Sequence, residues 1–180
     1  EKRGPALQRN LGARKAKYDS LVFLDADNLI EDDFLENALV NVEKTGADCA
    51  SSFFDPIEDK YFYRFMTTFY NRYIYMLQKV YGLSAEAFLF VKESVFEAVG
   101  GFDEKLIYSE DRDFTRRVFK KGFKFYVFKK PRIKISFRRF ENDGVLKTGA
   151  LILIAEIRQL FGQRFDDLKK INYRFGHYIN

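Results

Sequence analysis

Two aspartates stand one residue apart at the end of an apolar run, in the sequence LVFLDADN at residues 21–28. Their carboxylates, on Asp25 and Asp27, repel each other unless a cation or a hydrogen-bond donor joins them. A hard divalent ion such as Mg²⁺ or Mn²⁺ resolves that repulsion, and it normally keeps positions open for phosphate oxygens. The pair could therefore hold a metal ion that in turn holds a diphosphate.

Three other interpretations compete for these aspartates. Acidic and amide side chains after a strand often cap the next helix, and Asn28 or Asp32 could serve there too. An EF-hand loop would need glycine where the chain has Ile30. A phosphatase-type aspartate nucleophile finds no support elsewhere in the chain. Residues 21–28 alone leave helix capping and metal binding equally open.

A second acidic cluster lies far downstream, in the sequence SEDRDF at residues 109–114. Ser109 can cap a helix, and Glu110 and Asp111 fall in its first turn, where the helix dipole favours anions. The pair Gly100 and Gly101 precedes the cluster and allows a tight turn with close backbone approach. Taken alone, this pattern indicates ordinary helix-start chemistry.

The elements that must position these residues are short strands alternating with helices. We expect helices over residues 5–18, 31–45, 58–81, 92–99, 110–121 and 143–161, and strands over residues 20–24, 47–54, 86–91, 123–128 and 132–137. The helix over 58–81 should be bent or split, and Pro131 should mark a turn between the last two strands. This alternation predicts an α/β layered sheet, in which ligands bind beyond the carboxyl ends of the strands.

Composition limits the classes of protein that need to be considered. The chain has 180 residues, 47% hydrophobic and 32% charged, which predicts one folded domain with a real core. Its single cysteine, Cys49, permits no intrachain disulfide and favours a reducing compartment. The net charge of +5 suits an anionic partner, which could be a nucleotide, a phospholipid surface or a nucleic acid. The apolar stretch 145–155 is too short to span a bilayer.

Three segments in this order and spacing, LDADN, VGGFDE and SEDRDF, resemble a family-2 glycosyltransferase of the GT-A fold over residues 5–140. The resemblance implies an α/β fold of the GT-A (Rossmann-like) type, a three-layer sandwich with a mostly parallel mixed sheet. It further implies an N-terminally truncated chain, without the family's first strand and nucleotide-base pocket. We expect the GT-A core over residues 1–142 and a helical extension over 143–180, packed on the core or on a membrane surface.

The resemblance also implies an activity and its residues. The activity is an inverting transfer of a sugar from a nucleotide sugar to an acceptor hydroxyl, with Asp111 as general base. Asp113 matches a further acid of the same motif, and Arg9 falls in a segment near the donor. The remaining implied positions are Asp25 and Asp27 for Mn²⁺ or Mg²⁺, Asn10, Asp25, Asp27, Arg138 and Arg139 for the donor, and Glu110 and Gly101 for the acceptor. Family members often add a late histidine as a metal ligand, but His177 is more simply a surface residue.

The partners that follow are a UDP- or GDP-sugar and a glycan, polysaccharide or lipid-linked acceptor, with a cytoplasmic location at or near the inner face of a membrane. The aromatic helix over 61–81 could line an acceptor groove, pack in the core, or lie on a membrane with Arg64, Arg72 and Lys79 at the headgroups. One alternative is a degenerate, non-catalytic transferase domain. The other is a nucleic-acid-binding module, whose phosphates the acidic clusters would repel.

Overall fold

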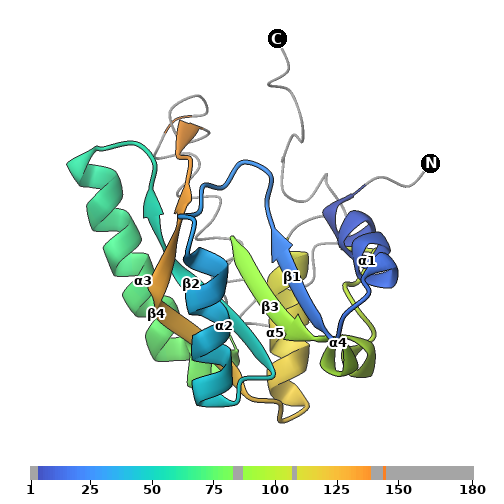
Figure 1. The fold of residues 1–180 in the computed structure, drawn as a ribbon. Coiled ribbons are helices and arrows are strands. Elements are labelled where there is room, and N and C mark those ends of the chain that lie inside the picture. The colour runs from blue at the N-terminus through green and yellow to red at the C-terminus, as the bar shows by residue number, and fades with distance from the viewer. Residues whose placement is uncertain (1–3, 83–86, 107–108, 139–143, 145–180) are drawn as a thin grey trace.

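The computed structural model describes residues 4–82, 87–106, 109–138 and 144, and shows strands alternating with helices (Figure 1). The elements are α1 (Pro5–Lys15), β1 (Ser20–Leu24), α2 (Phe34–Thr45), β2 (Cys49–Pro56), α3 (Tyr61–Tyr81), β3 (Phe88–Lys92), α4 (Glu93–Val99), α5 (Glu110–Lys120) and β4 (Phe125–Ile135). The expected helix over 143–161 lies outside the described residues, as does the extension over 143–180 apart from Gly144.

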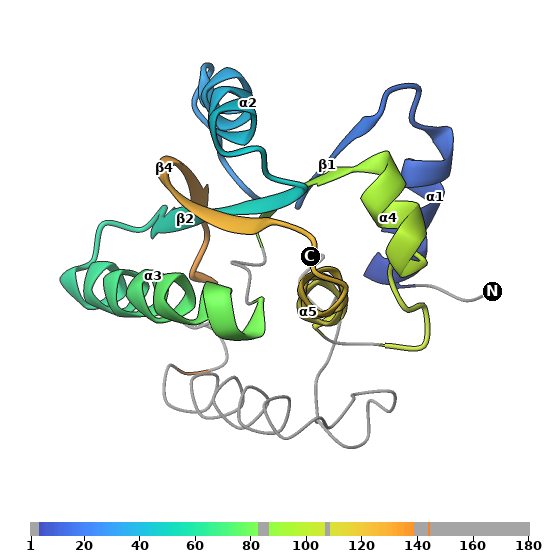
Figure 2. The same ribbon diagram turned by 90° about the horizontal axis from the view of Figure 1, so that it is seen from below.

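The four strands of the described residues form one mixed sheet in the order β1-β3-β2-β4. β3 pairs antiparallel with β1 and with β2, whereas β2 and β4 are parallel. Three strands therefore share one direction, although two of the three pairings are antiparallel. Figure 2 shows α2 on one face of the sheet and α3 and α5 on the other. This arrangement confirms the predicted α/β three-layer architecture.

Aromatic side chains fill the core on both faces of the sheet. On the α2 face, Phe34 meets Phe88 of β3 edge to face, with ring centroids 5.0 Å apart. On the other face, Phe102 stacks on Phe114 of α5 at 4.7 Å, and Phe96 lies against both. All five rings are buried, and each contributes roughly 1.5–3 kcal/mol to folding. The second cluster therefore gives α5 a rigid base.

Two expectations about element boundaries are wrong. The helix over 58–81 is not split, because α3 is a single helix of 21 residues that is followed by Gly82 as its C-cap residue. The strands expected over 123–128 and 132–137 are one strand, β4, which continues through Pro131. The pairing with β2 shifts register between Ser52 and Phe54, so residues 129–132 form an irregularity opposite Phe53. A proline fits there because a bulged position needs no ladder hydrogen bond.

Candidate active site

Arg9 of α1 joins the two acidic clusters that the sequence keeps apart. Its Nη2 donates a hydrogen bond to Oδ1 of Asp25 at 2.7 Å, and its Nη1 donates to Oε1 of Glu110. The guanidinium also lies over the ring of Phe102, 5.5 Å from the centroid. The end of β1 and the start of α5 therefore meet at one charged cluster.

The topology explains why these residues converge. Asp25 follows the last residue of β1, and Glu110 is the first residue of α5, whose far end leads into β4. The loop after β1 then crosses to the end of β4, where the backbone N–H groups of Leu29 and Lys134 each donate to the other's carbonyl, at 2.9 and 2.8 Å. The acidic residues thus lie at the carboxyl edge of the sheet, where α/β proteins bind ligands.

The cluster around Arg9 is largely shielded from water. The exposed fraction of the side chain is 17% for Arg9 and 8% for Glu110, but 42% for Asp25. Burial alone lowers the pKa of the Arg9 guanidinium, yet the carboxylates of Asp111, Glu110 and Asp25 outweigh that effect and raise this pKa above its ordinary value. One charged guanidinium is therefore shared by three carboxylates, and Asp111 belongs to the same electrostatic cluster.

Asp111 is buried in the first turn of α5, where its Oδ1 accepts a hydrogen bond from the backbone N–H of Arg112 at 2.8 Å. Ser109 is the N-cap residue, as expected, but its side chain makes no capping hydrogen bond, so that part of the expectation is wrong. Its backbone is left-handed, with φ of 55°, which costs a residue other than glycine about 1–2 kcal/mol. Such strain is typical of functional positions.

Asp27 is exposed and has no hydrogen-bond or ion-pair partner among the described residues. The capping interpretation is wrong for the next helix, because α2 has Asp33 as its N-cap residue and no side-chain capping bond. Asn28 instead donates to the carbonyl of Ala87 at 2.8 Å. Residues 25–28 therefore form a short turn that contacts with Arg9 and Ala87 hold in place, and the Asp27 side chain in this turn is exposed to solvent.

Among the described residues, the carboxylates of Asp25 and Asp27 are the candidate metal ligands at this site. Within those residues, no three or more His, Cys, Asp or Glu side chains gather in a way that could hold one. Asp27 has no described partner, and Asp25 uses only Oδ1 for Arg9, so one oxygen of Asp25 is open to a cation. Mg²⁺ commonly takes one or two protein carboxylates and completes its shell with water and phosphate oxygens. The pair fits such a site.

Asn10 and Gly101 contact each other. The Asn10 amide donates from Nδ2 to the Phe102 carbonyl and to Oε1 of Glu104, both at 2.9 Å, and its Oδ1 accepts from the Phe102 N–H at 2.9 Å. Gly101 has φ of +66°, and a Cβ there would lie 2.8 Å from Oδ1 of Asn10. The hydrogen bonds of the Asn10 side-chain amide connect α1, which also carries Arg9, to the turn after α4. The donor role of Asn10 and the acceptor role of Gly101 stay predictions.

Asp113 holds the same turn from the other side. Its Oδ2 accepts from Nε of Arg117 at 2.7 Å, and Nη1 of Arg117 donates to the carbonyls of Val99 and Gly101 at 2.6 and 2.8 Å. The third acid of the SEDRD segment therefore orients an arginine that braces the Gly100–Gly101 turn.

Arg138 is exposed just beyond the end of β4, where its backbone N–H and its Nε both lie within hydrogen-bond distance of Oγ of Ser136. Among the described residues, no hydrogen bond links it to Asp25 or Glu110. Arg139 and His177 lie outside the described residues. What sequence reasoning missed is the ion pairing of Arg9, and the available signal was a cation beside Asn10 in a chain with two unexplained acidic clusters.

Comparisons with known proteins bear on this arrangement. The sequence model of glycosyl transferase family 2 matches residues 1–99. Among solved structures, the mannosyltransferase PcManGT from Pyrobaculum calidifontis, in complex with GDP-Man and Mn²⁺, is 21% identical with a TM-score of 0.61, covering 74% of this chain and 36% of that one. TarS 1–349 of S. aureus is 13% identical with a TM-score of 0.55, covering 74% and 40%.

The same TarS segment in complex with UDP-GlcNAc is 15% identical with a TM-score of 0.54, covering 74% of this chain and 39% of that one. At these identities the likeness shows the fold, which is the predicted GT-A type. The chain spans 36–40% of the length of these three structures. No curated protein sequence matches it. Among the described residues, no helix is both long and apolar enough to cross a membrane.

Proposed function

The chain belongs to glycosyl transferase family 2, and on that premise we propose that it serves an inverting transfer of a sugar from a nucleotide sugar to an acceptor hydroxyl. The observation that carries the proposal is the Arg9 bridge, which brings the Asp25–Asp27 pair and the Glu110–Asp111 pair to one edge of the sheet. A displacement reaction needs two such sites, one for the leaving diphosphate and one for the incoming hydroxyl.

Asp111 is the proposed general base. It would take the proton of the acceptor hydroxyl as the oxygen attacks the anomeric carbon, on the face opposite the leaving diphosphate, which inverts that carbon. Its burial and the hydrogen bond from the Arg112 N–H support this role, because they hold the carboxylate in one orientation. Glu110 is held beside it by Arg9 and, with Gly101, is proposed to face the acceptor.

Asp27 and Asp25 are proposed to hold Mn²⁺ or Mg²⁺ together with the donor. When bound, the metal ion would stabilise the negative charge that develops on the leaving diphosphate. The open position of Asp27 and the second oxygen of Asp25 support this assignment. PcManGT was solved with GDP-Man and TarS with UDP-GlcNAc, so a UDP- or GDP-sugar is the proposed donor class. Asn10, Arg138 and Arg139 are its further proposed contacts.

The proposed acceptor is a glycan, polysaccharide or lipid-linked hydroxyl of the cell envelope, and the proposed location is cytoplasmic, at the inner face of a membrane. The single Cys49 accords with a reducing compartment. Its side chain is fully buried, and burial raises the pKa of its thiol well above the ordinary value, so it is a protonated core group.

The first test changes Asp111→Asn in the full-length protein. The variant should lose about 10²–10⁴-fold in transfer rate, because the amide cannot accept the proton, while nucleotide-sugar binding stays within about two-fold. Asp55→Asn, which alters a half-buried aspartate of β2 that pairs with Arg132, is the matched control and should leave the rate unchanged. Near-full turnover by Asp111→Asn would refute the base assignment.

The second test changes Asp27→Ala and follows nucleoside diphosphate binding by calorimetry with and without Mn²⁺. The metal-dependent part of the binding should disappear, because one of two carboxylate ligands is gone. Asp32→Ala removes an exposed acid from the same loop and should bind as the parent does. If Asp27→Ala bound the nucleoside diphosphate with the same Mn²⁺ dependence as the parent, the metal assignment would be refuted. Metal-dependent binding without transfer of any sugar would favour the non-catalytic alternative.

A further inference from the structure

Helix α3 has a reversed burial pattern: it buries polar side chains and exposes apolar ones. The residues it buries against the sheet are mostly polar, namely Tyr63, Thr67, Asn71, Ile74 and Gln78. Six of the residues it exposes are large and mostly apolar, namely Tyr61, Phe62, Phe65, Phe69, Met76 and Val80, alongside polar Arg64, Thr68, Arg72 and Lys79. A helix that covers a sheet normally presents the reverse pattern.

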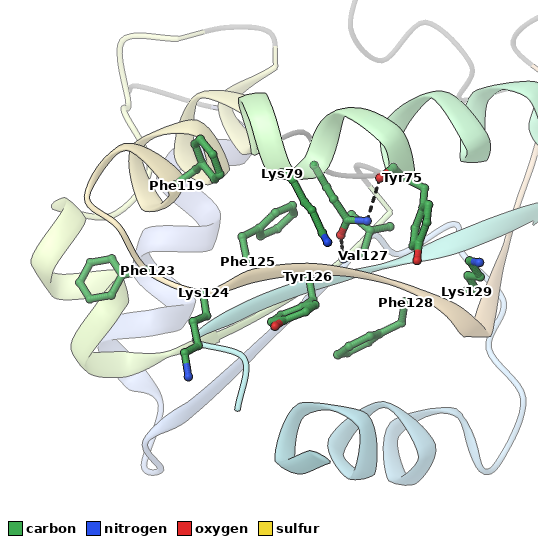
Figure 3. A pocket seen from close by; sticks show the side chains of 11 residues that line it. Tyr75, Lys79, Phe119, Phe123, Lys124, Phe125, Tyr126, Val127, Phe128 and Lys129 are labelled. Carbon is green, nitrogen blue, oxygen red and sulfur yellow. Dashed lines mark hydrogen bonds between the residues drawn. The ribbon is translucent and has the colours of Figure 1, made fainter. Parts of the chain in front are cut away.

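The inward polar side chains are fully engaged, so α3 is fixed in this orientation. Asn71 donates to the carbonyl of Phe54 at 2.7 Å and accepts from its N–H at 3.2 Å. Gln78 accepts from the N–H of Val127 on the edge strand β4 at 2.7 Å and donates to the carbonyl of Tyr75 at 2.8 Å, as the dashed lines of Figure 3 show. Rolling the helix to bury its apolar face would leave these buried groups unsatisfied.

The outward apolar residues form one continuous stripe. Phe65, Phe69, Met76 and Val80 are spaced by four, seven and four residues, which places them on one face of the helix. Phe65, Phe69 and Met76 are 72%, 70% and 75% exposed. Over residues 62–80 the stripe is roughly 27 Å long. An apolar surface of this length on a folded domain indicates an interaction site.

The charges of the C-terminal two thirds of the stripe are positive, whereas at its N-terminal end Arg64 pairs with the exposed Asp59. α3 contains no acidic residue, and Arg72 and Lys79 are exposed beside the stripe. Its C-terminal half borders a pocket of about 480 Å³ between α3, the end of α5 and β4, which Lys79, Lys124 and Lys129 line together with aromatic residues (Figure 3). None of the described residues that line this pocket is acidic. Lys79 and Lys129 therefore add positive charge at the C-terminal end of the stripe.

We propose that the outer face of α3 docks on the surface of an anionic lipid bilayer. The side chains of Phe65, Phe69 and Met76 enter the boundary between headgroups and acyl chains, while Arg72 and Lys79 contact headgroup phosphates. A second copy would bring its own cationic α3 against this one. Residues 145–180, with six Lys or Arg against three Asp or Glu, lack the complementary charge too. The proposal does not depend on the proposed transfer reaction.

The first test is co-sedimentation of the full-length protein with vesicles of phosphatidylcholine, with or without about 30% phosphatidylglycerol. The parent should bind the anionic vesicles. Phe65→Gln with Phe69→Gln should weaken that binding at least about ten-fold, because two aromatic side chains no longer enter the bilayer. The matched control, Leu35→Gln with Leu39→Gln, changes two exposed leucines of α2 and should bind as the parent does.

The cationic part is tested separately. Arg72→Gln and Lys79→Gln should each weaken binding to anionic vesicles roughly five-fold and leave binding to neutral vesicles unchanged. Equal binding of parent and Phe65→Gln/Phe69→Gln to anionic vesicles, with circular dichroism showing both folded, would overturn the proposal. So would a failure of the parent to bind them at all.

A fluorescence reporter identifies the occupant of the stripe directly. These 180 residues contain no tryptophan, so Phe69→Trp introduces a single one into a protein of these residues, and Leu39→Trp on α2 is its control. Emission of Phe69→Trp should be that of an exposed indole in buffer, shift to the blue with anionic vesicles, and be quenched by brominated lipids. Blue emission in buffer that vesicles do not change would show another part of the chain, or a second copy, on this face. Sedimentation analysis would separate those two results, and either one refutes lipid docking.

Discussion

At one end of the sheet, beyond β1, the guanidinium of Arg9 is shared by the carboxylates of Asp25, Glu110 and Asp111. At the other end, before β2 and β4, the balance is reversed. There Oδ1 of Asp48 accepts from Nζ of Lys92 at 2.8 Å, and Oδ2 accepts from the backbone N–H of Lys124 at 3.0 Å. In the first cluster three carboxylates lie around the Arg9 guanidinium, and Asp27 nearby has no described partner. The second gives one carboxylate a donor for each oxygen.

The backbone differs in the same way. Beyond β1 the left-handed position before α5 is held by Ser109, whose Cβ makes that conformation costly. Near the opposite end, the left-handed positions after α2 and α5 are glycines, Gly46 and Gly122. The end of the sheet at Asp48 thus has favourable backbone conformations and a fully hydrogen-bonded carboxylate. The end at Arg9 has a strained backbone at Ser109 and clustered carboxylates, which a bound ligand could stabilise. Three substitutions test this contrast.

The largest effect is expected for Arg9→Met, which keeps the length of the side chain and removes its charge. Three neighbouring carboxylates would then lie together without the shared cation, at a cost of about 3 kcal/mol in the free energy of unfolding. Urea denaturation at neutral pH measures that loss. Arg64→Met is the control, because its pair with Asp59 is exposed on both sides and is worth about 0.5 kcal/mol or less. Equal losses for the two variants would remove the contrast between the ends of the sheet.

Gly101→Ala should be the next largest, at about 2 kcal/mol. The alanine would have to adopt φ of +66° with its Cβ 2.8 Å from Oδ1 of Asn10. Gly122→Ala is the matched control, because it has φ of +81° but nothing within 4 Å of the added Cβ, and it should cost only about 1 kcal/mol. Thermal or urea unfolding of both variants gives the comparison.

A double mutant shows whether Asn10 causes the difference. In an Asn10→Ala background, the additional cost of Gly101→Ala should fall toward that of Gly122→Ala without reaching it, since the opposing oxygen is gone but the ring of Phe96 still lies 3.2 Å from the added Cβ. If the additional cost of Gly101→Ala is the same in the parent and in the Asn10→Ala background, the contact between α1 and the turn is not what makes this glycine necessary.

Sequence patterns located most of the elements and the two acidic clusters because these features are local. A strand ending at Leu24, a helix ending before Gly46 and a helix starting near Glu110 are each set by neighbouring residues. The apolar run of that strand also suggested burial, which is wrong, because β1 lies at the edge of the sheet and buries only Leu21. The predicted edge of the sheet followed from the order of strands and helices alone. Local sequence patterns were therefore sufficient to predict the fold class and to place Asp25 after a strand and Asp111 at the start of a helix.

The parts that sequence reasoning missed depend on contacts between distant segments. Arg9 and Glu110 are 101 positions apart, and nothing local links them. The inversion of α3 depends on backbone groups of Phe54 and Val127, which attract the polar side chains Asn71 and Gln78 inward. The passage of β4 through Pro131 depends on the register of β2. In each case a partner outside the local window decides the outcome.

The smallest effect is expected for Asp48→Asn, at about 1 kcal/mol at neutral pH. Burial alone would raise the pKa of Asp48, but the hydrogen bonds from Lys92 and the Lys124 N–H lower it below the ordinary value of 3.8. The charged form therefore stabilises the fold fully above that value, and this contribution is lost as the pH falls through the lower pKa of the folded state. Unfolding of parent and variant, measured from neutral pH down into the acid range, should converge only below pH 3.8. A difference that stays constant across that range would mean that the carboxylate charge is not what stabilises this end.

Donor binding by Asp48→Asn should equal that of the parent, because the end of the sheet that this substitution weakens lies away from Arg9. A loss of donor binding would show that the two ends of the sheet are coupled.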